Sequence, residues 1–182
     1  MKIFINPGHC PGVDPGAVNE LIGLEEASVV YEVGTLVSDL LDEAGCEVYL
    51  CQSDNLYYDG IGENVIASAN NWPADIFLSL HCNAFNGKAK GTETCVYSLS
   101  GSGAKLGQCI QSQLISSIGT VDRGLKERPR LIVLKRTNMP AALVEIAFID
   151  NEEDAEILIN KKNEIARAIA RGVTDYLQMT AS

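Results

Sequence analysis

The chain has 182 residues, 46% hydrophobic and 21% charged, which is the composition of an ordinary globular domain. Its net charge of −10 argues against a nucleic-acid partner or an anionic membrane surface, because both require basic patches. No apolar stretch approaches the roughly 20 residues needed to span a bilayer. We therefore expect residues 1–182 to form one domain without a membrane span.

From the amino terminus, short apolar or alternating runs predict strands, and segments with apolar residues at helical spacing predict the helices between them. The predicted strands cover residues 2–5, 47–50, 75–80, 92–97, 131–134 and 141–144. The predicted helices cover residues 24–41, 63–71 and 104–118, with a closing helical region at 151–177. Residues 54–62, which include Tyr57 and Tyr58, and the basic segment 121–130 are expected to be loops.

This alternation of strands and helices indicates an α/β fold. We expect a single-domain, wound, mostly parallel twisted β-sheet flanked by helices on both faces. One or two antiparallel strands are compatible with the pattern.

Three polar residues follow predicted strands. His9 comes shortly after residues 2–5, His81 directly after 75–80, and Glu145 directly after 141–144. Ligands of open α/β sheets bind at the carboxyl ends of strands, so these side chains are expected to meet in one site. A surface position suits Glu145 poorly, because apolar residues flank it on both sides and an unpaired buried charge is costly.

Two imidazoles and one carboxylate are the usual ligands of a catalytic zinc ion, whose fourth position is taken by water. The sequence alone leaves the carboxylate ligand open among Glu20, Glu25 and Glu26. One of the last two is expected to be only a helix-start charge. Glu145 then remains as the base that takes a proton from the water.

The six cysteines show no CxxC pairing and are expected to be reduced thiols. Cys10 and Cys82 adjoin the two histidines, which makes them alternative metal ligands. This alternative is disfavoured, because neighbouring side chains on a strand point to opposite faces.

Six stretches of the sequence resemble, in order, the motifs of zinc-dependent N-acetylmuramoyl-L-alanine amidases of the amidase 3 type, as found in autolysins, cell-division amidases and phage endolysins. They are Ile5-Asn6-Pro7-Gly8-His9, Asp14-Pro15-Gly16-Ala17, Gly23-Leu24-Glu25-Glu26, Ser79-Leu80-His81-Cys82-Asn83-Ala84, Arg123-Gly124-Leu125-Lys126 and the run from Pro140-Ala141 to Asp150-Asn151. The resemblance extends from about residue 2 to residue 175.

The resemblance implies a peptidoglycan hydrolase that cuts the amide between the lactyl group of muramic acid and L-alanine of the stem peptide. It implies that His9, Glu26 and His81 hold Zn²⁺ and that Glu145 is the catalytic carboxylate. Glu26 is implied because the ligand of this family lies three residues after a glycine, here Gly23.

Two further residues are candidates for substrate contact. Asn83 lies in the motif that contains His81, and Arg123 lies in the one basic cluster of an acidic chain. Muramyl peptides carry carboxylates, which arginine binds well, although a solvated loop is an equally good interpretation of this cluster.

Two other classes of protein remain as alternatives. A carboxypeptidase-like zinc enzyme would need an arginine to hold a free carboxyl terminus, with Arg123, Arg128 and Arg130 as candidates. A non-catalytic peptidoglycan-binding module is disfavoured, because no expected catalytic residue is missing. The resemblance places the activity at the bacterial cell wall. The amino terminus has no signal-peptide pattern, so release by phage-driven lysis or a signal that has been removed is expected.

Overall fold

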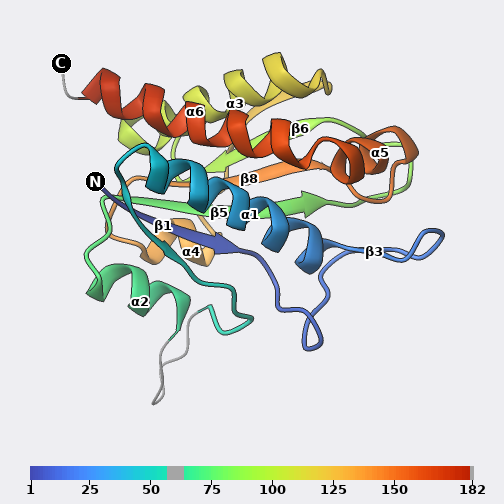
Figure 1. Cartoon of the computed structure of the whole chain (residues 1–182), viewed down its shortest axis with the longest axis horizontal. Coiled ribbons are helices and arrows are strands. Elements are labelled where there is room, and N and C mark those ends of the chain that lie inside the picture. Colours follow the sequence, from blue (N-terminus) through green and yellow to red (C-terminus); the bar gives the residue numbers. More distant parts are fainter. Residues whose placement is uncertain (57–63, 181–182) are drawn as a thin grey trace.

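The computed structural model describes residues 1–56 and 64–180, in which a six-stranded sheet lies between two layers of helices (Figure 1). The strand order in the sheet is β4-β1-β5-β8-β6-β7. These strands are β1 (Lys2–Pro7), β4 (Glu47–Leu50), β5 (Ile76–Asn83), β6 (Thr92–Val96), β7 (Asp122–Glu127) and β8 (Ala141–Phe148). A separate small hairpin is formed by β2 (Val18–Asn19) and β3 (Leu24–Glu25).

The strands β4, β1, β5 and β8 run parallel to one another. Strand β6 is antiparallel to β8, and β7 is parallel to β6. The predicted α/β class is confirmed, because the sheet is mostly parallel and its two antiparallel members lie together at one side.

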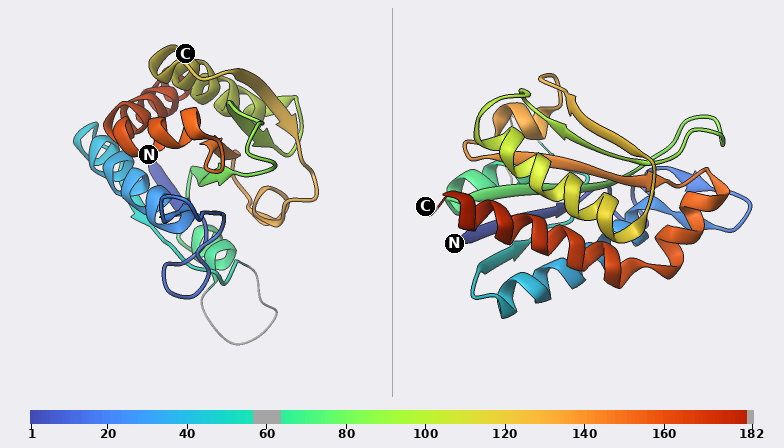
Figure 2. Two further views of the ribbon diagram at one scale, coloured as in Figure 1. Left: turned by 90° about the vertical axis from the view of Figure 1, so that its right-hand side faces the viewer. Right: turned by 90° about the horizontal axis from the view of Figure 1, so that it is seen from above.

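Helices cover both faces of the sheet, as Figure 2 shows end-on. The helices are α1 (Glu26–Glu43), α2 (Val65–Asn71), α3 (Gly101–Ile118), α4 (Ile132–Arg136), α5 (Glu152–Asn160) and α6 (Lys162–Thr180). Helices α1, α3, α5 and α6 pack on one face through a large apolar cluster that includes Leu78, Leu80 and Val144. Helices α2 and α4 pack on the other face through a smaller cluster that includes Phe77 and Leu143.

The smaller cluster covers only the first half of the strands. Because side chains alternate along a strand, the face that carries Phe77 also carries Ser79, His81 and Asn83. Likewise, the face of β8 that carries Leu143 carries Glu145. The carboxyl-terminal half of this face is therefore polar, and the candidate site lies there.

Two predicted elements were wrong. Residues 131–134 begin the helix α4 instead of forming a strand, and residues 122–127 of the predicted loop form the strand β7. Both errors have the same cause. Strand β7 pairs with β6 and occupies the edge of the sheet, so residues 131–134 cannot form the edge strand there. Only one side of the run from Leu131 to Leu134 is buried. Val133 and Leu134 are buried and Ile132 is exposed, and one helical turn gives this arrangement.

Three predicted strands end later than expected, and the first of them, β1, continues to Pro7. Strand β5 continues to Asn83 and β8 to Phe148, because their backbones keep pairing beyond the His81–Glu145 register position. His81 and Glu145 therefore lie within strands, and only His9 lies in a loop after its strand. The closing helical region is two helices, α5 and α6, which are separated at Lys161. Tyr57 and Tyr58 lie outside the described residues.

Candidate active site

Two glycines make room for the side chains of the site. A Cβ atom on Gly8 would lie 2.2 Å from Cε1 of His81, so the imidazole packs directly on the backbone after β1. A Cβ atom on Gly16 would lie 2.6 Å from Oε2 of Glu26 and 2.7 Å from Cδ2 of His9. His9 itself has φ of 62°, a conformation rare outside glycine. Backbone strain at a non-glycine residue is typical of functional positions.

Glu26 connects the two histidines. It is the first residue of α1 and is 3% exposed. Its Oε1 accepts hydrogen bonds from Nδ1 of His81 at 2.9 Å and from the backbone N–H of Cys82 at 2.9 Å. Its Oε2 accepts from the backbone N–H of Ala17 at 2.8 Å and lies 3.3 Å from Nε2 of His9. One buried carboxylate thus fixes both imidazole rings.

Asp14 orients the other side of the His9 ring. Its Oδ2 lies 2.7 Å from Nδ1 of His9, and its Oδ1 accepts from the backbone N–H of Gly16 at 3.0 Å. The Nε2 atom of His9 is thereby directed toward Glu26. A carboxylate on the second ring nitrogen is the usual means of orienting a metal-binding histidine.

The pKa values reflect these contacts. The hydrogen bond with Glu26 is the largest cause that raises the pKa of His9, to about 9, with Asp14 adding to it and burial opposing it. Burial alone would raise the pKa of Glu26, but hydrogen bonds from His81 and His9 hold that pKa well below its usual range. Glu26 is therefore a carboxylate at every pH at which the protein is expected to work.

The donor set fits a metal ion. His9, Glu26 and His81 each offer one ligand atom, and these atoms lie within 4.8 Å of one another. A tetrahedral zinc ion with bonds of about 2.0–2.1 Å needs donors roughly 3.3 Å apart, so only small adjustments separate this arrangement from a closed site. The other two glutamates considered from the sequence, Glu20 and Glu25, do not belong to this group. Glu20 is exposed and Glu25 is partly exposed. Neither Cys10 nor Cys82 belongs to the group.

Glu145 lies beside the group but is not part of it. It faces His81 from the adjacent strand β8, where the two residues are register partners. Its Oε2 is buried and has no hydrogen-bond partner among the described residues. Burial is the largest cause that raises its pKa, to about 7, and the carboxylates of Glu26 and Glu93 raise it further. Such a group exchanges a proton readily near neutral pH.

Sequence analysis did not single out Glu93 or Asp14. Glu93 is 6% exposed, lies opposite Glu145 on β6, and accepts a hydrogen bond from Nε of Arg123 at 2.8 Å. Its signal in the sequence is a charge between Thr92 and Thr94 within a strand. Asn83 ends β5 and accepts a hydrogen bond from the backbone N–H of Ala84.

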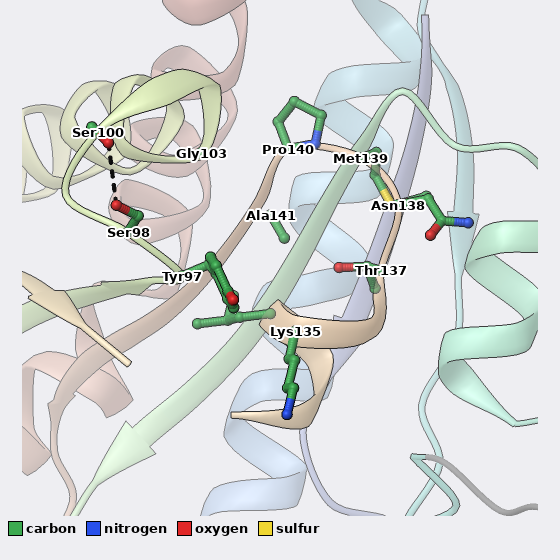
Figure 3. Close-up of a pocket in the computed structure, with 11 residues that line it drawn as sticks. Tyr97, Ser98, Ser100, Gly103, Lys135, Thr137, Asn138, Met139, Pro140 and Ala141 are labelled. Atoms are coloured by element: carbon green, nitrogen blue, oxygen red, sulfur yellow. Dashed lines mark hydrogen bonds between the residues drawn. The ribbon is translucent and has the colours of Figure 1, made fainter. Parts of the chain in front are cut away.

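A cavity of about 320 Å³ lies away from these residues (Figure 3). It opens at the first residues of β8, and its lining includes Tyr97, Lys135 and Asn138. Glu145 is four residues further along β8, roughly 13 Å at the usual rise of a strand. The cavity is therefore separate from the polar half of the sheet.

Comparison with known proteins shows the family of the chain. The Amidase_3 family model, described as N-acetylmuramoyl-L-alanine amidase, matches residues 3–175. The chain belongs to this family. It is an enzyme domain of the class that hydrolyses peptidoglycan, as the sequence motifs predicted. The family is metal-dependent, and His9, Glu26 and His81 form a group able to hold a metal ion.

Individual relatives support the same conclusion. The sporulation-specific N-acetylmuramoyl-L-alanine amidase of Bacillus subtilis is 34% identical over 98% of this chain and 67% of its own length. The amidase LytC of the same organism is 36% identical over 96% of this chain, which spans only 35% of LytC. The crystal structure of an N-acetylmuramoyl-L-alanine amidase from Clostridium difficile 630 superposes with a TM-score of 0.85 at 29% identity, covering 97% of this chain and 96% of that one.

The burial of Glu145 predicts a pH-dependent cost in stability. A carboxylate whose pKa rises from 4.5 to about 7 on folding destabilises the protein above pH 4.5, with the full cost present above pH 7. We expect Glu145→Gln to raise the free energy of unfolding of the metal-free protein at pH 8, by about 3 kcal/mol at most. Most of this gain should disappear at pH 5. Chemical denaturation in the presence of a chelator measures both values.

The control is Glu25→Gln, which changes a partly exposed carboxylate next to Glu26 in the sequence. It should give no comparable rise in the free energy of unfolding. An equal effect of Glu145→Gln at pH 5 and pH 8 would show that ionisation of Glu145 carries no cost.

Proposed function

We propose that this domain hydrolyses the amide between the lactyl group of N-acetylmuramic acid and L-alanine of the stem peptide, with zinc as its metal. The observation that carries this proposal is the buried Glu26 carboxylate with an imidazole nitrogen at each of its two oxygens. Two imidazoles and a carboxylate with an open side are the donor set of catalytic zinc. We propose His9, Glu26 and His81 as the ligands and residues 1–182 as one catalytic unit.

The zinc ion, when bound, would polarise the scissile carbonyl and lower the pKa of the attacking water. Glu145 accepts the proton of that water and delivers it to the leaving nitrogen of L-alanine. Two observations support this role. The Oε2 atom of Glu145 is buried without a partner, so it is available to a proton, and its pKa of about 7 allows it both to accept and to release one.

Peptidoglycan is the proposed substrate, and Asn83 and Arg123 are proposed to contact it. Both lie on the polar half of the sheet near Glu145. The proposed place of action is the bacterial cell wall. Among the described residues, no helix is both long enough and apolar enough to cross a bilayer.

Digestion of purified peptidoglycan tests the proposed reaction. With zinc, mass spectrometry of the products should reveal new free amino termini on L-alanine, and a chelator should abolish them. New reducing ends on the glycan would instead identify a glycosidase. Release of D-alanine from the stem's carboxyl terminus would identify the carboxypeptidase alternative.

The ligand assignment predicts a pattern of metal content. His81→Ala and Glu26→Gln are expected to lose most bound zinc and activity together, because each removes one of three ligands. Glu20→Gln and Glu25→Gln are matched controls on the neighbouring glutamates and should retain one zinc per chain. Elemental analysis of the four variants measures this. Full zinc in Glu26→Gln with loss in either control would refute the assignment.

The role of Glu145 predicts a different pattern. Glu145→Gln should keep zinc, fold and substrate affinity, but should lower kcat by roughly 10²–10⁴-fold, the usual contribution of a general acid–base group. Zinc content, melting temperature and turnover are measured on one sample. Near-normal turnover with full zinc would contradict the mechanism.

A further inference from the structure

A row of three side chains crosses the polar half of the sheet. His81 on β5 is the register partner of Glu145 on β8, and Glu145 is the register partner of Glu93 on β6. Cross-strand partners lie on the same face of a sheet, with Cβ atoms about 5 Å apart. The row therefore begins at the proposed metal ligands and ends at a buried carboxylate that the proposed mechanism does not use.

An irregularity in β7 brings Arg123 to the end of this row. Thr92 pairs with Asp122 and Glu93 pairs with Gly124, so Arg123 is an extra residue without a partner position on β6. Gly124 has φ of 70°, which suits such a bulge. Bulges redirect side chains, and here Nε of Arg123 donates to Oε2 of Glu93 at 2.8 Å.

A second irregularity, in β8, supplies a surface for the guanidinium. His81 pairs with Glu145, but Asn83 pairs with Phe148, so β8 contains one more residue than β5 in this interval. The ring of Phe148 is thereby placed below Arg123, whose Cζ lies 4.9 Å from the ring centroid. Arg123 is held at one edge by Glu93 and on one face by Phe148.

The terminal nitrogens of Arg123 remain available. The structure shows no partner for them among the described residues, and the side chain is 36% exposed, whereas that of Glu93 is 7% exposed. An arginine fixed in this way has already lost much of its side-chain freedom, so binding a second carboxylate costs less entropy. Two terminal N–H groups in a plane match a carboxylate.

The distance from Glu145 to the guanidinium of Arg123 indicates which carboxylate of the substrate Arg123 can reach. Glu93 lies one strand beyond Glu145, about 5 Å away, and the guanidinium of Arg123 donates to the Glu93 carboxylate at 2.8 Å, so the guanidinium lies roughly 8 Å from Glu145. An extended peptide advances about 3.5 Å per residue, so the second residue of the stem lies roughly 7 Å from the scissile amide. The two distances therefore agree to within the length of one hydrogen bond, about 3 Å.

We infer that Arg123, positioned by Glu93 and Phe148, binds the free α-carboxylate of the second stem residue. This residue is a D-glutamyl group linked through its side chain, and its α-carboxylate is converted to a carboxamide in some cell walls. The inference rests on the proposed amidase reaction and adds its specificity: the enzyme favours stem peptides with the free carboxylate. A carboxamide loses the charge, and its NH₂ group faces a donor.

Two substrates that differ only in this group test the inference. They are N-acetylmuramyl-L-alanyl-D-isoglutamate and N-acetylmuramyl-L-alanyl-D-isoglutamine. We expect kcat/KM of the zinc-loaded enzyme to favour the first by roughly 10- to 100-fold, as for a lost charge-assisted hydrogen bond. The dissociation constants of the two product dipeptides, measured by calorimetry, should show the same preference.

Variants assign the preference to its residues. Arg123→Met should bring the ratio of the two kcat/KM values close to one, and Arg123→Lys should leave part of it. Glu93→Gln should raise KM for the carboxylate substrate more than for the carboxamide substrate, whereas a merely structural role, or an effect through the pKa of Glu145, would change both substrates equally. Arg128→Met is the matched control, because Arg128 is exposed in the same segment and its guanidinium donates to the neighbouring Glu127 carbonyl instead of to Glu93. It should leave the ratio unchanged.

Equal kcat/KM values for the two substrates in the unmodified enzyme would overturn the inference, as would a preference that survives Arg123→Met. Either result leaves amide cleavage intact. If the amide is not cleaved at all, the proposed function fails. The dissociation constants of the two dipeptides then still decide whether Arg123 binds the carboxylate in preference to the carboxamide.

Discussion

The structure of the site depends on one buried carboxylate. Glu26 begins α1, accepts backbone hydrogen bonds from Ala17 and Cys82, and contacts both histidines. A buried charge is tolerated only when it is well paired, and these four contacts satisfy both of its oxygens. They also join three segments distant in sequence: the loop after β1, the start of α1 and the end of β5. Placing a donor set before a metal arrives lowers the cost of binding it.

Beyond Glu26, the sheet separates apolar side chains from polar ones along its strands. In the first half of β5 and β8, apolar side chains pack under α2 and α4. Further along the same face lie His81 and Glu145. The Oε2 atom of Glu145 is left buried without a partner among the described residues, which costs stability and keeps a proton acceptor next to the site. Two bulges then bring Arg123 and Phe148 against each other beyond Glu93. The residues proposed for the reaction and for specificity thus occupy neighbouring positions in one row.

Much of this was predictable from the sequence, and the remainder has identifiable causes. His9, His81 and Glu145 stand out because polar residues interrupt or follow apolar runs, and the geometry around Glu26 agrees with the motif rather than with Glu20 or Glu25. The strand expected at residues 131–134 failed because β-branched residues do not reveal that another segment already occupies the sheet edge. Phe148 was missed because its position follows from a bulge in β8, which shifts register by one residue without a clear mark in the sequence. Glu93 was missed although a charge within a predicted strand marks it, because the sequence does not show that it pairs with Glu145.

We propose that the Glu26 carboxylate and the two imidazoles together bind zinc, while Glu145 does not. Anomalous diffraction at the zinc absorption edge, from crystals of the zinc-loaded protein, measures this directly. The account predicts one peak bonded to Nε2 of His9, Nδ1 of His81 and the Glu26 carboxylate at about 2.0–2.2 Å, with Glu145 outside bonding distance. A peak coordinated by Glu145, or one held by Cys10 or Cys82 in place of Glu26, would contradict it.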